Sequence, residues 1–360
     1  MASMLDENKK YFICSLPYQV SIKEGLLDRE QIQDEMSESD FDEMKFQMEM
    51  QSLFYGDSKG AFFSFDDIDK RRKLKNAMYR PSSMSNKSYK IPDLVPNERR
   101  ILSVDVALMA SKTHKNDASA IIINSAIPTN NDNYIANIVY MENHEGLNTD
   151  ELALVVRKLY KEYKCTDLAI DTSGQGLGVF DALVRDIVDP ATGELYGALS
   201  CCNDKAMADR CKVRGAPEVI WSIKGNASFN NEICLLLRSG FKQGKINLLI
   251  SDQEAEELLR SNIKGFNKLP ADEQLMYKMP YIQTNLMVKE ITQLEYEIKS
   301  TNIKIKEKTG MRKDRYSSMA YNYWVQCQLE RDLLQTANNG FALSDYAKSI
   351  RSLNKKPVSY

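Results

Sequence analysis

The spacing of hydrophobic residues changes near residue 98. Upstream, apolar residues recur at helical spacing in an acidic background, as at Phe41, Met44 and Met48. This pattern predicts a mostly helical segment over residues 1–80. Residues 81–97 hold three prolines and several serines with little periodicity, which is typical of a linker.

Downstream of the linker, continuous apolar runs alternate with amphipathic helical patterns, which is typical of an α/β domain. The predicted strands cover residues 100–109, 117–126, 134–142, 167–173, 217–222 and 246–250. The predicted helices cover residues 149–164, 175–188, 226–239, 252–263, 284–300 and 315–334. We assign residues 98–335 to one domain and residues 336–360 to a C-terminal tail.

The order of these elements predicts how the strands pair. Three strands with short polar connections are typical of an antiparallel meander. The helix over 149–164 is long enough for a crossover, which would return the fourth strand parallel to one already in the sheet. The expected fold is a mixed sheet, part antiparallel meander and part parallel, flanked by helices.

Four aspartates fall where this topology brings strand ends together. Asp105 lies late in the first strand and Asp117 opens the second, so a hairpin would place them side by side. Asp171 ends the fourth strand, and it would lie beside Asp105 if the two strands were parallel neighbours. Open α/β sheets usually bind ligands at this carboxyl edge. Asp314 precedes the last helix and could be brought to the same edge.

A cluster of carboxylates is costly unless cations neutralise it. Two divalent ions would do so and would clamp the attacking and leaving oxygens of a phosphodiester. Each acid also has a structural alternative, because Asp117 and Asp171 suit turns and Asp314 suits a helix cap. An unpaired carboxylate among the apolar residues around Asp105 would be costly to bury, which favours a functional role there.

Charge is distributed unevenly along the chain, although the net charge is only −2. Basic residues gather over 299–315, and such a run can form a local phosphate-binding face. A solvated helix face or loop is the alternative. The predicted DNA-contacting residues are Lys304, Lys306, Lys308, Arg312, Lys313 and Arg315.

Composition and short motifs exclude several other classes. Two histidines and seven scattered cysteines form no zinc pattern, and we expect the cysteines to be reduced. No apolar run approaches the roughly 18 residues that span a bilayer, and the N-terminus has no secretory signal. There is no GxxxxGK[ST] motif, so we expect no ATP hydrolysis.

Two further sequence patterns favour a structural role over a role in ligand binding. Gly174, Gly176 and Gly178 have GxGxG spacing rather than GxGxxG, which favours a tight turn over a dinucleotide site. Aromatic residues of the last helix fall at helical core spacing, so we predict that they pack inside. These aromatic residues are Tyr316, Tyr321, Tyr323 and Trp324.

Three stretches of the chain resemble the acidic motifs of the nuclease domain of the large terminase of tailed bacteriophages. They are VDVALMASKTHKNDASAIII, AIDTSGQGLGVFDAL and GMRKDRYSSMAYNYW. The segment WSIKGNASFNNEICLLLRSGFKQGKINLLI is also similar to that family. Residues 26–68 resemble the segment that joins the family's ATPase half to its nuclease half. The resemblance covers about residues 10–335.

This resemblance implies a ribonuclease H-like endonuclease that cuts concatemeric double-stranded viral DNA during packaging with two Mg²⁺ or Mn²⁺ ions. Asp105, Asp171 and Asp314 would be the catalytic metal ligands, and Asp117 would help to hold one ion. The implied partners are the ATPase half, the portal and the small terminase subunit, in the host cytoplasm. The family often has paired acids at the third motif, whereas Lys313 precedes Asp314 here.

Two other functions fit the same residues. A Holliday-junction resolvase of the same fold uses similar acids and would prefer four-way junctions. A non-catalytic module of a packaging motor would grip or dock DNA without cutting it.

Overall fold

The computed structural model describes residues 18–30, 32, 62–84, 88–107, 118–129, 133–299, 302–307 and 312–353, with side chains of the last helix described to Leu333. Asp117 and Lys308 lie outside the described residues. Within the described part, no helix is long and apolar enough to cross a membrane.

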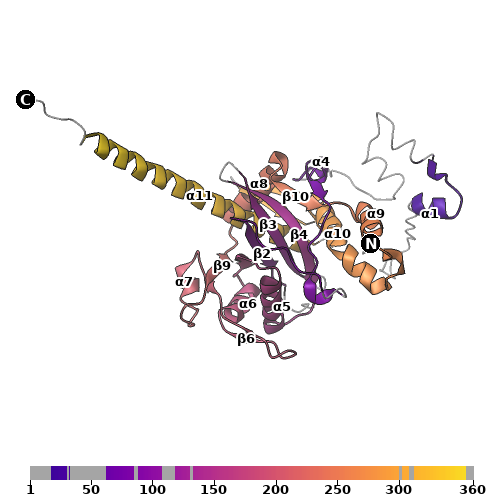
Figure 1. Ribbon diagram of the computed structural model, residues 1–360, viewed down its shortest axis with the longest axis horizontal. Helices are drawn as coiled ribbons and strands as arrows, with labels where there is room; N and C mark the ends of the chain where they lie inside the picture. The colour runs from indigo at the N-terminus through magenta and orange to yellow at the C-terminus, as the bar shows by residue number, and fades with distance from the viewer. Residues whose placement is uncertain are drawn as a thin grey trace, which may run out of the picture.

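An eight-stranded mixed sheet forms the centre of the molecule, with the order β1-β10-β4-β3-β2-β5-β9-β8 (Figure 1). β3 is antiparallel to both of its neighbours, and the other pairs are parallel. Seven strands therefore share one direction and end at the same edge. The strands are β1 (Arg72–Leu74), β2 (Arg99–Asp105), β3 (Ser119–Pro128), β4 (Tyr134–His144), β5 (Asp167–Asp171), β8 (Ser200–Cys201), β9 (Glu218–Ile223) and β10 (Ile246–Leu249).

The predicted topology is confirmed at the middle of this sheet. β2, β3 and β4 form the antiparallel meander. Helix α5 (Thr149–Glu162) is the crossover, and β5 returns parallel to β2 with Val104 opposite Ile170. Asn148 and Glu151 form a capping box that fixes where α5 begins.

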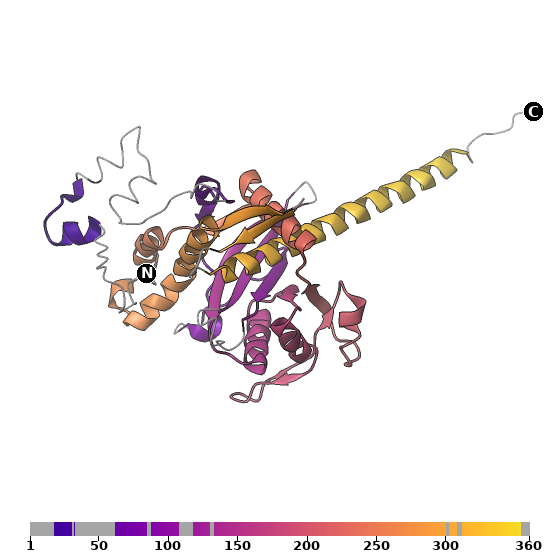
Figure 2. The same ribbon diagram turned by 180° about the vertical axis from the view of Figure 1, so that it is seen from behind.

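Helices cover both faces of the sheet, and each face has its own core. On one face, α5 and α6 (Gln175–Leu183) bury side chains such as Leu152, Phe180 and Leu183. The other face is covered by α8 (Ala227–Gln243), α10 (Ala271–Thr292) and the first half of α11 (Asp314–Leu353) (Figures 1 and 2). These helices bury side chains such as Leu237 and Met319.

Helix α11 is attached to the sheet through a row of buried polar side chains one turn apart. The hydroxyl groups of Ser318 and Ser103 lie 3.0 Å apart. The Asn322 amide donates to the carbonyl oxygens of Ile101 and Ile122 and to the Ser103 hydroxyl. Further along, Asn124 donates to Gln326. Buried polar groups require partners, so this polar row fixes the rotation and register of α11 on the sheet.

The predicted helix over 284–300 is wrong in its second half. The helix is α10, which ends at Thr292, and the chain then forms an antiparallel hairpin of β11 (Glu295–Lys299) and β12 (Asn302–Lys306). In β12, apolar residues alternate with lysines, and Ile303 and Ile305 pack against the core of the α8 face. This period of two favours a strand.

Residues upstream of position 98 also belong to the sheet and its core. Strand β1 pairs with β10, and Phe62 and Phe63 are buried in the core. At the other end, helix α11 runs to Leu353 and projects away from the sheet, beyond the predicted helix end near Leu334 (Figure 2). The division of the chain into four parts stays a prediction.

The remaining elements lie outside the eight-stranded sheet. They are α1 (Tyr18–Lys23), α4 (Phe65–Asp69), η2 (Pro81–Ser83), β6 (Ile187–Val188), β7 (Leu195–Tyr196), α7 (Lys205–Ala208), α9 (Asp252–Asn262) and η3 (Phe266–Lys268).

Candidate active site

Three elements bring three carboxylates to one edge of the sheet. Asp105 ends β2 and Asp171 ends the adjacent parallel strand β5. Asp314 begins α11, and its Oδ2 accepts a hydrogen bond of 3.2 Å from the amide of Ala118, just before β3. All three aspartates are partly buried. The structure therefore brings Asp105, Asp171 and Asp314 to one edge of the sheet, and their role as metal ligands stays a prediction.

The Asp105 carboxyl experiences the charge of both other acids. Burial raises its pKa well above the ordinary value, and the negative charges of Asp314 and Asp171 raise it further. A hydrogen bond from Ser317 and the charge of Lys313 act in the opposite direction and are weaker. Ionising Asp105 is therefore unfavourable unless a positive charge is added to the site.

One face of α11 supplies the groups that hold these acids. Asp314, Ser317 and Tyr321 follow one another at helical spacings of three and four residues, so they share a face. Ser317 hydrogen-bonds to Asp105 and Tyr321 to Asp171. Tyr321 is buried, as its core spacing predicted, but its contact with Asp171 was missed. Its spacing from Asp314 was the available signal.

The glycine-rich turn after β5 serves close packing beside Asp171. A Cβ on Gly176 would lie 1.8 Å from the backbone oxygen of Asp171. Gly174 has a φ of +53°, a conformation that favours glycine. The turn thus lets the first turn of α6 approach the end of β5. This agrees with the tight turn that the spacing favoured.

The chemistry of the three aspartates suits a hard divalent cation, because such ions prefer carboxylate oxygens as ligands. The hydroxyl groups of Ser317 and Tyr321 contact these carboxylates. The electrostatics also fit, since a cation would relieve the cost of ionising Asp105. In the described part of the chain, however, no three carboxylate, histidine or thiolate groups lie close enough together to hold one ion. The predicted fourth acid, Asp117, is outside the described residues.

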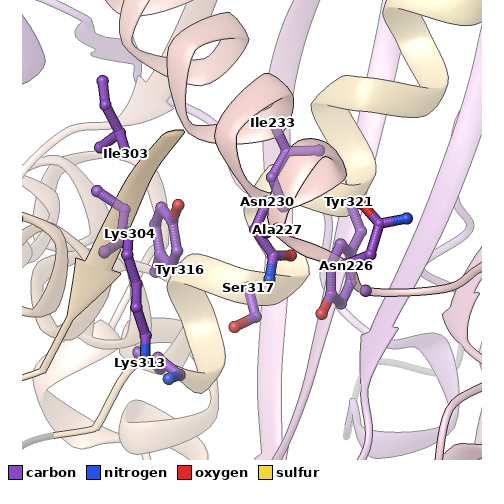
Figure 3. Close-up of a pocket in the computed structure, with 12 residues that line it drawn as sticks. Asn226, Ala227, Asn230, Ile233, Ile303, Lys304, Lys313, Tyr316, Ser317 and Tyr321 are labelled. Atoms are coloured by element: carbon purple, nitrogen blue, oxygen red, sulfur yellow. The ribbon is translucent and has the colours of Figure 1, made fainter. Parts of the chain in front are cut away.

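A cavity of about 500 Å³ opens beside the acids, between α8, the β11–β12 hairpin and the start of α11. Lys304 and Lys313 lie at one side of it, Tyr321 lies at the other, and Ser317 is between them (Figure 3). Asn226, the N-cap of α8, also lines it. Since Ser317 and Tyr321 contact Asp105 and Asp171, the cavity adjoins the carboxylates.

Four of the predicted DNA-contacting residues have acidic partners, and one of them is Lys313 of the cavity, which pairs with Glu307 at 2.8 Å. Lys306 pairs with Glu297, and Arg312 pairs with Glu145 at 2.7 Å. Arg315 is 8% exposed and bonds to Glu290, so its guanidinium faces the interior instead of a surface. Counting charges in sequence could not separate this buried arginine from its exposed neighbours.

Similar solved structures come from bacteriophages. The large terminase nuclease of the thermophilic phage G20c with bound magnesium is 12% identical, with a TM-score of 0.41 over 74% of this chain and 97% of that chain. The nuclease domain of the large terminase subunit gp2 of bacterial virus Sf6 is 10% identical, with a TM-score of 0.41 over 73% and 98%. The large terminase of bacteriophage HK97 is 8% identical, with a TM-score of 0.38 over 83% and 50%.

All three are large terminase proteins. No family model and no curated protein matches the chain.

Proposed function

We propose that this chain is a metal-dependent endonuclease that cuts double-stranded DNA during viral genome packaging. The observation that carries the proposal is the meeting of Asp105, Asp171 and Asp314 at one sheet edge, where ionising Asp105 is unfavourable without a cation. The adjoining cavity with two lysines suits a phosphodiester, because cationic side chains attract phosphate without reading bases.

The three aspartates would hold Mg²⁺ or Mn²⁺ ions, two in number, with help from Asp117. Bound ions of this kind activate water and stabilise the leaving oxygen of a phosphodiester. Ser317 and Tyr321 would orient the carboxylates of Asp105 and Asp171 through their hydroxyl groups. Lys304 and Lys313 would hold the DNA backbone at the cavity.

The biological setting is part of the same proposal. The substrate would be concatemeric viral DNA in the host cytoplasm. The partners would be a terminase ATPase half, the portal and the small terminase subunit. This chain would contribute cleavage and no ATP hydrolysis.

Nicking of supercoiled plasmid with Mn²⁺ tests the proposal directly. We expect the wild-type chain to nick and Asp171→Asn to lose nearly all activity. Asp66→Asn, an exposed carboxylate on α4, is the matched control and should behave as wild type. Equal activity in all three proteins would contradict the assignment. A strong preference for four-way junctions would indicate a resolvase, and DNA binding without any cleavage would indicate a gripping module.

The two cavity lysines give a separate prediction for binding. Each of Lys304→Ala and Lys313→Ala should weaken DNA binding about equally for all sequences and should lower the salt slope by about 1. Lys161→Ala, on the α5 face and paired with Glu194, is the control. Filter binding or fluorescence anisotropy between low and moderate salt gives these slopes. An unchanged slope in both cavity variants would remove the lysines from the DNA contact.

A further inference from the structure

A buried polar cluster joins α10 to the first turn of α11. Glu290 and Arg315 are each 8% exposed. The Arg315 guanidinium donates to Glu290 Oε2 at 3.2 Å. It also donates to Gln283 Oε1 at 3.0 and 3.1 Å. The guanidinium is therefore held by two residues of α10 that lie two turns apart.

Glu290 has a second contact, with the backbone of α11. Its Oε1 accepts a hydrogen bond of 2.9 Å from the amide of Tyr316. The first amides of a helix have no partner within the helix, so Glu290 supplies an acceptor from a neighbouring element. One carboxylate thus binds both the side chain of Arg315 and the main chain one residue later. These two contacts define the position of the helix start, where Asp314 lies.

The charges of this cluster act on the acid site. Burial raises the pKa of Glu290, and the charge of Asp314 raises it further, against the opposing effects of the Tyr316 amide and Arg315. Glu290 therefore lies within the electrostatic field of Asp314. The positive charge of Arg315 compensates the negative charge of Glu290. The cluster therefore supports the three aspartates of the site without adding an uncompensated negative charge beside them.

We propose that Glu290, together with Arg315, is a positioning residue that fixes the first turn of α11 and thereby holds the Asp314 carboxylate at the metal-binding edge. The inference rests on the proposed nuclease function. Removing a residue that orients a metal ligand without touching the metal usually lowers the affinity for the metal. Glu290 would act in this way through the helix start, without touching DNA or the reacting atoms.

Direct Mn²⁺ binding to the full chain tests the inference, measured by calorimetry and by the electron spin resonance signal of free Mn²⁺. We expect Glu290→Ala to weaken Mn²⁺ binding by about 10-fold or more. Glu290→Gln keeps an acceptor for the Tyr316 amide and should recover part of this loss. Arg315→Lys keeps the charge but loses the forked contact with Gln283, and it should lie between wild type and Glu290→Ala.

The chain provides a matched control. Glu98 is 6% exposed, accepts from Arg100 at 2.7 Å and accepts from the amide of Val95 at 2.9 Å. It precedes β2 and so lies at the opposite edge of the sheet from Asp105. Removing one partner of a buried pair destabilises a protein wherever the pair lies. Glu98→Gln should therefore lower the melting temperature and leave Mn²⁺ affinity unchanged.

The possible results separate the two proposals. Wild-type Mn²⁺ affinity in folded Glu290→Gln and Arg315→Lys would overturn the positioning role alone. Equal loss of Mn²⁺ affinity in the Glu98 and Glu290 variants would also overturn it, because the cause would then be general destabilisation. Absence of Mn²⁺ binding and nicking in the wild-type chain would overturn both the proposed function and the inference. A selective loss in the Glu290 and Arg315 variants supports the inference.

Discussion

Replacing Asp105 with asparagine should abolish DNA cleavage and, at neutral pH without metal, make the chain more stable. Cleavage should fall by about 10³-fold or more, as expected for a metal ligand of the proposed active site. Stability should rise because burial and two neighbouring acids oppose ionisation of Asp105. Asparagine keeps the shape of the side chain and removes the charge.

The pH dependence gives the sign of this stability change. Folding raises the pKa of Asp105, so the folded chain keeps this proton to a higher pH than the unfolded chain does. The stability linked to this proton is fully present below the ordinary aspartate pKa of about 3.9. It is lost as the pH rises through the raised pKa that Asp105 has in the folded chain. Wild type in chelator should thus lose stability relative to Asp105→Asn across this range.

Thermal melting of both proteins with chelator and with Mn²⁺ measures the effect. We expect Mn²⁺ to stabilise the wild-type chain, because a ligand that binds only the folded state stabilises it, and to stabilise Asp105→Asn much less. A variant that melts below wild type in chelator at neutral pH would show that the site does not carry this electrostatic cost.

Replacing Gly176 with alanine should have the second largest effect. Its Cβ would lie 1.8 Å from the backbone oxygen of Asp171, so the end of β5 or the start of α6 must move. Overpacking of this kind costs about 1–3 kcal/mol in stability. Displacement of Asp171 should also lower cleavage well beyond the loss of folded protein. Urea unfolding and plasmid nicking measure the two effects.

Gly193→Ala is the control for this change. Gly193 lies between the short strands β6 and β7 with a φ of +72°, and nothing lies within 4 Å of its added Cβ. It should lose stability through backbone strain alone and keep full activity in the folded protein. Equal specific activity of the two glycine variants would show that the close approach at Gly176 does not position Asp171.

The sequence was sufficient to place two acids, because the relevant contacts follow from local patterns. A crossover helix of the predicted length leads to a parallel neighbour, and this brought Asp171 beside Asp105. Asp314 was placed mainly by resemblance, helped by the basic run beside it, since its position depends on how α11 packs across the sheet. The polar row of Ser318 and Asn322 that fixes this packing has its partners in β2 and β3, at least 200 residues away.

The predictions that were wrong or incomplete also concern contacts between residues far apart along the chain. Arg315 was predicted to contact DNA, but its partners Glu290 and Gln283 lie 25 and 32 residues upstream in another helix. Strand β1 was missed because its partner β10 lies more than 170 residues later. The hairpin over 295–306 was the exception, because the alternation of isoleucine and lysine in β12 was visible locally and favours a strand.

The attachment of α11 to the sheet also determines when the proposed active site can be completed during synthesis of the chain. Asp314 follows Asp105 by 209 residues, and ribosomes add about 5–20 residues per second. Asp105 therefore leaves the ribosome roughly 10–40 s before Asp314 does at this rate. Nascent chains that already contain Asp105 and Asp171 would hold an incomplete site, and cleavage of nearby DNA would begin only after the final helix has docked.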